Sequence, residues 1–270
     1  MHPALITHMR IIFTGDTVGE TGRNALYRAL EMWRDTLRPD IVVANGENAA
    51  GGRGITMALA HEFFEHGVHA ITLGDHAWDQ ADLTRHIDEE PRLLRPHNLQ
   101  AGTPGHGSLL LPTPEGTLGI LCLQGRTFMN PGPENPFTRG KEEAERLRRE
   151  GACAVLVDFH AETTSEKVAM GYHLDGIAAA VFGTHTHVQT ADARILPGGT
   201  AHITDVGMCG SRDGVIGRNA AAVLDCLVNS MPGKLTIGGW PAQVNGAMVD
   251  VDMNTGMATR LEPINLILEK

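Results

Sequence analysis

Short apolar runs alternate along the chain with segments whose apolar residues recur at helical spacing. Residues 9–16 (MRIIFTGD) form an apolar run that predicts a buried strand, and residues 19–37 carry apolar positions three and four apart, which predicts an amphipathic helix. Further strands are predicted at 41–48 and 70–75, each followed by a helical segment. This alternation of strand and helix is typical of a parallel sheet built from βαβ units.

The pattern changes in the second half of the chain. Strands are predicted at 152–160 and 177–183, but from residue 191 onward short strands dominate, including one at 234–239. The chain ends in a predicted hairpin that turns at Asn254-Thr255-Gly256, with alternating residues on either side. The sequence therefore predicts α/β units first and an antiparallel sheet afterwards.

Domain organisation follows from the same pattern and from the length of 270 residues. At about 150 residues per domain the length allows one large domain or two small ones. The absence of a clear linker favours a single domain over residues 9–270. Gly, Pro and polar residues dominate between 92 and 140, so we expect a candidate insertion or cap region within 92–150, where a charged helix is predicted at 141–150. Residues 1–8 are expected to be an N-terminal extension.

Polar clusters follow five of the predicted strands, at the point where each strand ends. They are Gly15-Asp16, Gly46-Glu47-Asn48, Gly74-Asp75-His76, Asp158-Phe159-His160 and Gly183-Thr184-His185-Thr186-His187. Open α/β sheets place their sites at the carboxyl edge of the strands, so we expect these clusters to meet there.

The clusters supply a mixed set of oxygen and nitrogen ligands. The candidate ligands are Asp16, Glu47, Asp75, His160, His185 and His187. Such a set suits manganese, iron, zinc or cobalt better than calcium. Six ligands are too many for one catalytic metal that keeps an open position. They suit two metals about 3.5–4 Å apart that share a carboxylate.

Composition narrows the classes of partner. The net charge is −10, and the aromatic residues are only 7 Phe, 3 Trp and 2 Tyr, which gives no strong sign of extended nucleic-acid binding. The sequence contains no run of 18 apolar residues, so it predicts no membrane span. The four cysteines form no CxxC pair or disulfide framework, and the first eight residues do not resemble a signal peptide. A cytoplasmic location is therefore expected.

The ordered motifs GD, GEN, GDH, FH and GTHTH resemble the pattern of the calcineurin-like metallophosphoesterases. Longer stretches look like the YmdB-type bacterial phosphodiesterase subfamily; they are GDTVGETGR, VVANGENAAGG, TLGDHAWD, DFHAETTSEK, GTHTHVQTAD and TDVGMCG. The resemblance covers nearly the whole chain. It implies a four-layer α-β-β-α sandwich, in which two mixed sheets are flanked by helices, and we expect the two halves of the chain to correspond to the two sheets.

The resemblance also implies a role for each site residue. Asp16 and His187 would hold the first metal, Glu47 would bridge both, and Asp75, His160 and His185 would complete the second. Asn48 would contact the substrate phosphate, and His76 would protonate the leaving oxygen. The metals would be two divalent or mixed-valence transition ions, with iron or manganese expected and zinc or cobalt as alternatives.

The reaction implied is hydrolysis of a small phosphodiester, with cyclic nucleotides such as 2′,3′-cyclic AMP as substrates. A hydroxide that bridges the two metals would attack phosphorus in line with the leaving oxygen. One residue departs from the family pattern, because Asp75 stands where Asn is usual. Asp75 either adds negative charge to the site or simply replaces one oxygen ligand with another.

Other functions remain open from the sequence. A nuclease or a protein phosphatase would use the same metal site on another substrate. A regulatory protein could carry a residual metal site left from an earlier activity, although all six positions hold competent ligands. A metal-dependent amidohydrolase usually has its HxH motif on the first strand, whereas here it comes late. Assembly into a homo-oligomer is also left open.

Overall fold

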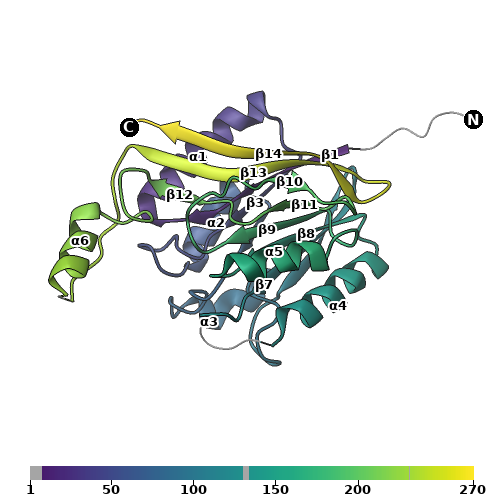
Figure 1. Cartoon of the computed structure of the whole chain (residues 1–270), viewed down its shortest axis with the longest axis horizontal. Helices are drawn as coiled ribbons and strands as arrows, with labels where there is room; N and C mark the ends of the chain where they lie inside the picture. Colours follow the sequence, from purple (N-terminus) through teal and green to yellow (C-terminus); the bar gives the residue numbers. More distant parts are fainter. Residues whose placement is uncertain (1–7, 130–133, 231) are drawn as a thin grey trace, which may run out of the picture.

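The strands form two sheets in a computed structural model that describes residues 8–129, 134–230 and 232–270 (Figure 1). The first sheet contains, in spatial order, β2 (Asp16–Thr17), β12 (Met208–Ser211), β13 (Ala242–Asp252), β1 (His8–Thr14), β3 (Ile41–Asn45), β4 (Ala70–Thr72) and β5 (Leu93–Leu94), with β14 (Met257–Leu268) paired to β13. The second sheet contains, in spatial order, β10 (Arg194–Ile195), β11 (Ala201–Ile203), β9 (Ala180–Thr184), β8 (Ala154–His160), β7 (Gly116–Gln124) and β6 (Ser108–Thr113).

Strand directions match the predicted change of pattern only in part. β1, β3, β4 and β5 are parallel, as the early βαβ pattern predicts. The C-terminal hairpin is confirmed, because β13 and β14 pair antiparallel along their length. The expectation that each half of the chain forms one sheet is wrong. β13 pairs with β1, so the end of the chain returns to the first sheet, while β7, β8, β9 and β11 form the parallel centre of the second.

Six α-helices lie among the described residues. They are α1 (Gly19–Thr36), α2 (Met57–Glu65), α3 (Leu83–His86), α4 (Pro136–Arg149), α5 (Thr164–His173) and α6 (Ala220–Asn229), and a short 3₁₀ helix covers Ile87–Glu89. Figure 1 shows α4 and α5 beside the second sheet and α6 standing apart from both sheets. None of the helices in the described part of the chain is long and apolar enough to cross a membrane.

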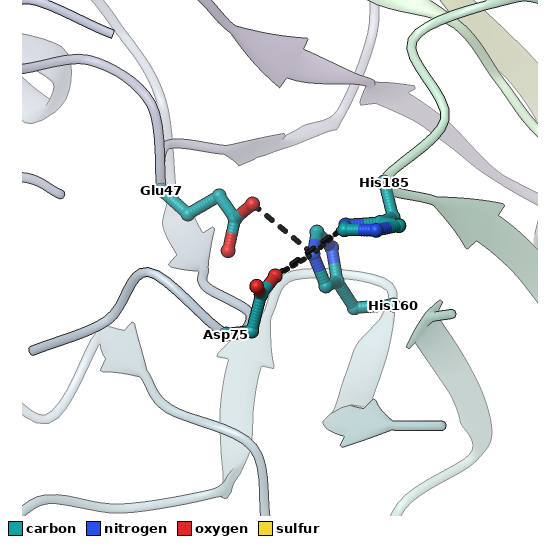
Figure 2. Close-up of side chains that lie close together, drawn as sticks. All are labelled: Glu47, Asp75, His160 and His185. Carbon is teal, nitrogen blue, oxygen red and sulfur yellow. Dashed lines mark hydrogen bonds and ion pairs between the residues drawn. The ribbon is translucent and has the colours of Figure 1, made fainter. Parts of the chain in front are cut away.

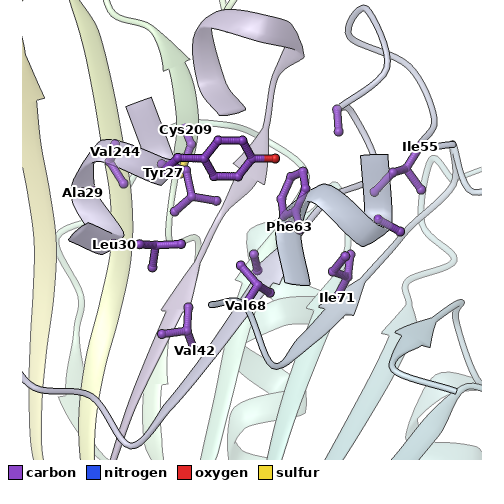
Figure 3. Packing of buried hydrophobic residues seen from close by; sticks show 14 of the residues in the cluster. Tyr27, Ala29, Leu30, Val42, Ile55, Phe63, Val68, Ile71, Cys209 and Val244 are labelled. Atoms are coloured by element: carbon purple, nitrogen blue, oxygen red, sulfur yellow. The ribbon is translucent and has the colours of Figure 1, made fainter. Parts of the chain in front are cut away.

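Side chains alternate along the strands and so divide the core into layers. In β1, Ile11 and Phe13 face the second sheet, and the Phe13 ring lies 5.7 Å from the Phe182 ring. Ile12, between them, packs instead in a cluster with residues of α1 and α2. Figure 3 shows other members of this cluster, among them Leu30 of α1 and Phe63 of α2. A third cluster joins the other face of the second sheet to α4 and α5. Helix, sheet, sheet and helix therefore stack in that order, and the predicted four-layer α-β-β-α arrangement is confirmed.

Several elements differ from the sequence prediction, and the following differences change the picture most. The charged helix begins at Pro136 and not at residue 141, because Asn135 caps it by accepting a hydrogen bond from Phe137 N and Pro136 suits the first turn. The strand predicted at 234–239 is reduced to a single bridge between Ile237 and Arg218. Strand β1 begins at His8, so only residues 1–7 of the expected extension remain, and they lie outside the described residues.

The region expected to hold an insertion contributes to both sheets. Within 92–150, β5 belongs to the first sheet, β6 and β7 belong to the second, and α4 covers the second. Residues 130–133 of this region lie outside the described residues. The single-domain assignment stays a prediction.

Candidate metal centre

The carboxyl ends of strands from both sheets bring four of the predicted ligands into one cluster (Figure 2). Glu47 follows β3 and Asp75 follows β4, while His160 ends β8 and His185 follows β9. Each offers one ligand atom, and the four atoms lie within 4.8 Å of one another. His160 Nε2 lies 3.0 Å from Glu47 Oε1 and 3.1 Å from Asp75 Oδ1, and His185 Nδ1 lies 3.4 Å from Asp75 Oδ1.

The two remaining predicted ligands lie beside this cluster. Asp16 is fully buried in β2, and its Oδ1 lies 3.5 Å from His187 Nε2. Asn48 joins the two groups, because its Nδ2 lies 3.4 Å from Asp16 Oδ1, 3.2 Å from Glu47 Oε1 and 3.3 Å from His187 Nε2. The structure therefore gathers all six predicted ligands and Asn48 at one edge of the two sheets.

The His160 ring is held from the side opposite the cluster. Its Nδ1 lies 2.8 Å from Thr184 Oγ1, and Thr184 in turn donates its hydroxyl proton to Asp158 Oδ1 at 2.7 Å. Asp158 is buried between the sheets and also accepts hydrogen bonds from Asn45 and Thr72. With Nδ1 donating to the Thr184 oxygen, Nε2 faces the carboxylates and is the nitrogen that would bind a metal after losing its proton. Imidazole binds a metal in this neutral form.

The other two histidines follow the same arrangement. His185 directs Nδ1 to the cluster, and its Nε2 lies 3.0 Å from Glu162 Oε2. His187 directs Nε2 toward Asp16, and its Nδ1 lies 3.1 Å from the carbonyl oxygen of Ile216. Each histidine thus has one nitrogen at an acceptor outside the cluster and the other nitrogen inside it. The donor set fits metal ions, because three carboxylates and three oriented imidazoles converge.

The cluster is also close-packed around a glycine. A Cβ atom on Gly74 would stand 2.2 Å from His160 Cδ2 and 2.3 Å from Glu47 Oε2, closer than atoms can approach. Any larger residue at 74 would therefore displace two of the candidate ligands. This gives a physical reason for the glycine in the GDH motif.

The charges of the cluster influence one another strongly. Burial opposes ionisation of Asp16 and Asp75, but their contacts with His187 and with His160 and His185 hold the pKa of each carboxyl below its usual range. Burial likewise opposes protonation of His160, but the nearby Glu47 and Asp75 raise its pKa well above the usual range. Asp158 differs, because burial raises the pKa of its carboxyl to about 6. The site carries excess negative charge that a cation would neutralise.

A cavity of about 550 Å³ opens in front of the cluster. Asn48 and His76 line it, together with Arg53 and Arg218. Asp79 Oδ2 accepts a hydrogen bond from Arg53 Nε at 2.8 Å and lies 3.0 Å from His76 Nδ1. No Phe, Tyr or Trp lines the cavity among the residues that the structure describes. Its size falls within the range of small-molecule sites, roughly 300–1,000 Å³.

The sequence did not single out the residues that orient the histidines. Glu162, Asp158 and Thr184 all lie in the clusters or motifs around His160 and His185, but only the histidines were taken as ligands. Asp158 was named only as a member of its cluster. Its structural role could have been inferred, because an acidic residue inside an apolar strand must be satisfied by buried partners. The carbonyl of Ile216 comes from a distant loop and left no local signal.

Comparison with known proteins identifies the family of this chain. A family model described as "YmdB-like protein" matches residues 12–264. The chain belongs to the YmdB-like family. A relative in this comparison, the 2′,3′-cyclic-nucleotide 2′-phosphodiesterase of Bacillus subtilis, is 42% identical over 257 residues, which cover 95% of this chain and 96% of the relative.

Solved structures are similar in fold to this YmdB-like chain. The crystal structure of a novel phosphatase from Mycoplasma pneumoniae superposes with a TM-score of 0.91 at 35% identity, covering 98% of this chain and 95% of that one. A 5′-nucleotidase precursor from Thermus thermophilus gives a TM-score of 0.55 at 15% identity, covering 97% of this chain and 55% of that one. The latter likeness concerns the fold alone.

Proposed function

We propose that this protein is a metal-dependent phosphodiesterase that hydrolyses small phosphate diesters, with 2′,3′-cyclic nucleotides as the preferred class. The observation that carries the proposal is the convergence of three carboxylates with three histidines whose second nitrogens all meet acceptors. Family membership supports the same activity, since the Bacillus subtilis relative is named as a 2′,3′-cyclic-nucleotide 2′-phosphodiesterase.

The proposed ligands divide into two overlapping groups. Asp16 and His187 would hold one ion, Asp75, His160 and His185 would hold the other, and Glu47 would serve both. Two divalent or mixed-valence ions, iron or manganese, match this mixed oxygen and nitrogen set, and zinc or cobalt is the alternative. When bound, such ions neutralise the charge of the phosphate and lower the pKa of a water molecule to near neutral pH.

The chain itself would supply binding and proton transfer. Asn48, buried between the two groups of ligands, would offer its amide to a phosphoryl oxygen at the floor of the cavity. His76 would act as general acid and protonate the leaving oxygen. Asp79 supports this role, because its carboxylate meets His76 Nδ1 and leaves Nε2 for the substrate. Arg53 and Arg218 add positive charge at the wall of the cavity.

The shape of the site favours a small substrate over a nucleic-acid strand. A cavity of about 550 Å³ suits one nucleotide. The described lining offers no aromatic surface on which successive bases of a strand would stack. A cytoplasmic location stays a prediction from the sequence.

The test is hydrolysis of 2′,3′-cyclic AMP by protein reconstituted with Mn²⁺, with 3′,5′-cyclic AMP and p-nitrophenyl phosphate measured in parallel. We expect the 2′,3′-cyclic ester to be cleaved fastest, and His187→Ala to abolish cleavage together with binding of one metal equivalent. Wild-type protein that binds two Mn²⁺ ions but cleaves none of the three compounds would refute the proposed activity.

A further inference from the structure

Glu162 reaches the metal centre from outside the predicted ligand set. It lies two residues after His160, in the segment between β8 and α5, and its Oε2 lies 3.0 Å from His185 Nε2. The opposite nitrogen of the same ring, Nδ1, lies 3.0 Å from His160 Nε2 and 3.4 Å from Asp75 Oδ1, inside the cluster. One imidazole therefore joins Glu162 to the proposed ligands.

The chemistry of imidazole determines which partner donates the proton in this contact. A neutral ring carries one proton, and the nitrogen that binds a metal must be free of it. A carboxylate can only accept a hydrogen bond, so Glu162 retains the ring proton on Nε2. The same contact fixes the angle of the ring.

His185 depends on such a contact more than the other two histidines do. The His160 ring is fully buried and is held by Thr184, and the His187 ring is held by a backbone carbonyl, which no side-chain substitution removes. The His185 side chain is 21% exposed, against 10% for His187 and 0% for His160. Because the His185 ring is the least buried of the three, the packing around it restrains its orientation least, and a side-chain partner matters most there.

We infer that Glu162 is a positioning residue that fixes the tautomer and orientation of His185 for metal binding. The inference rests on the metal centre of the proposed function and adds a residue to it. Glu162 contacts the ring and not the reacting atoms, so its effect is on metal affinity first and on the reaction through the metal. Its side chain is 48% exposed, so its replacement leaves the folded core intact.

Two substitutions separate the hydrogen bond from the charge. Glu162→Ala removes the acceptor, whereas Glu162→Gln removes the charge but keeps a carbonyl oxygen that can accept the Nε2 proton. The matched control is Glu89→Ala, because Glu89 Oε1 lies 2.9 Å from His86 Nδ1 in a similar pair on the surface. Metal-free wild-type protein and each variant are titrated with Mn²⁺ alone. Calorimetry measures binding directly, and the EPR signal of free Mn²⁺ gives the bound amount by difference.

We expect wild-type protein and Glu89→Ala to bind two Mn²⁺ ions with the same affinities. Glu162→Ala should bind one of the two ions about 10- to 100-fold more weakly, the usual effect of removing a partner of a metal-bound histidine. Glu162→Gln should stay within about threefold of wild type, because it keeps the hydrogen bond. Thermal unfolding of the metal-free proteins should be alike.

Two results would overturn the inference. One is Glu162→Ala binding both ions as tightly as wild type, and the other is Glu162→Gln losing as much affinity as Glu162→Ala, which would mean that charge and not the hydrogen bond matters. Failure of the proposed activity would give a different result. Wild type would then bind two Mn²⁺ ions, the variants would show the expected differences in Mn²⁺ affinity, and no protein would cleave a diester. Wild type that binds no Mn²⁺ would refute both.

Discussion

Lys167 and Asp205 form an ion pair in which each side chain is only 1% exposed, with 2.7 Å between Nζ and Oδ2. The same Oδ2 accepts hydrogen bonds from the backbone N–H of Thr186 at 3.1 Å and from its hydroxyl at 2.7 Å. Thr186 lies between His185 and His187, whose φ values are both positive. The pair therefore anchors the strained loop that carries two candidate ligands.

Breaking this pair should cost much of the stability of the protein. In Asp205→Asn the buried Lys167 ammonium loses its counter-charge, and an uncompensated buried charge typically costs about 3–5 kcal/mol. The free energy of unfolding from urea titration of metal-free protein measures the loss. Arg260→Gln is the control, because the ion pair of Arg260 with Glu262 lies on the surface and should contribute at most about 1 kcal/mol. Equal effects of the two substitutions would contradict the proposed anchoring.

His76 should affect the reaction without affecting metal binding. If it is the general acid, His76→Ala should lower kcat for 2′,3′-cyclic AMP by about 10²- to 10⁴-fold. Mn²⁺ stoichiometry should remain at the wild-type value, since His76 is not among the proposed ligands. His86→Ala is the matched control, because His86 forms a similar contact with Glu89, three residues on, at the surface. A His76→Ala enzyme within threefold of wild-type kcat would exclude the general-acid role.

Glu143 should make stability depend on acid pH. Burial opposes its ionisation, but hydrogen bonds from Arg146 and Ser108 lower the pKa of its carboxyl to about 2. A carboxyl whose pKa is lower in the folded state stabilises the protein above its unfolded pKa, near 4.3, and this contribution is lost as pH falls toward 2.

The prediction compares Glu143→Gln with wild type by chemical unfolding at several pH values. At pH 7 the variant should be less stable by about 3 kcal/mol, at 1.36 kcal/mol per pKa unit. The difference should shrink steadily below pH 4 and approach zero near pH 2. A difference that is constant from pH 7 to pH 3 would show that Glu143 acts through packing and not through its charge.

How far the sequence predicts this site depends on where the residues lie relative to strand ends. The predicted ligands lie at or just after the carboxyl end of a buried strand, and parallel strands bring such positions to one edge. They are Asp16, Glu47, Asp75, His160, His185 and His187. Glu162 and Asp205 could not be found in this way. Their partners come from other segments, and neither spacing nor local composition shows which acidic residue a given histidine or lysine will meet.

The fold shows the same limit. The apolar run at 9–16 predicts a buried strand, and side chains alternate along any strand, so Ile11 and Phe13 lie on one face, as the structure shows. The pattern does not show that β13 pairs with β1, because the pairing joins residues about 240 positions apart, such as Met9 and Val251. Loop closure over such a distance leaves no mark in either strand, so the sequence suggested a sheet for each half of the chain.

Phe63 should be a major source of stability in the layer between α1, α2 and the first sheet (Figure 3). Its side chain is fully buried, and its ring lies edge-on to Tyr27 with 5.6 Å between centroids. Phe63→Ala leaves a cavity among packed neighbours and should lower the free energy of unfolding by about 3–5 kcal/mol. Phe128→Ala removes the same ring from a residue that is 87% exposed. This control should change the free energy of unfolding by about 0.5 kcal/mol or less. Urea unfolding of both variants tests this, and a similar loss in the two would mean that Phe128 is covered in solution.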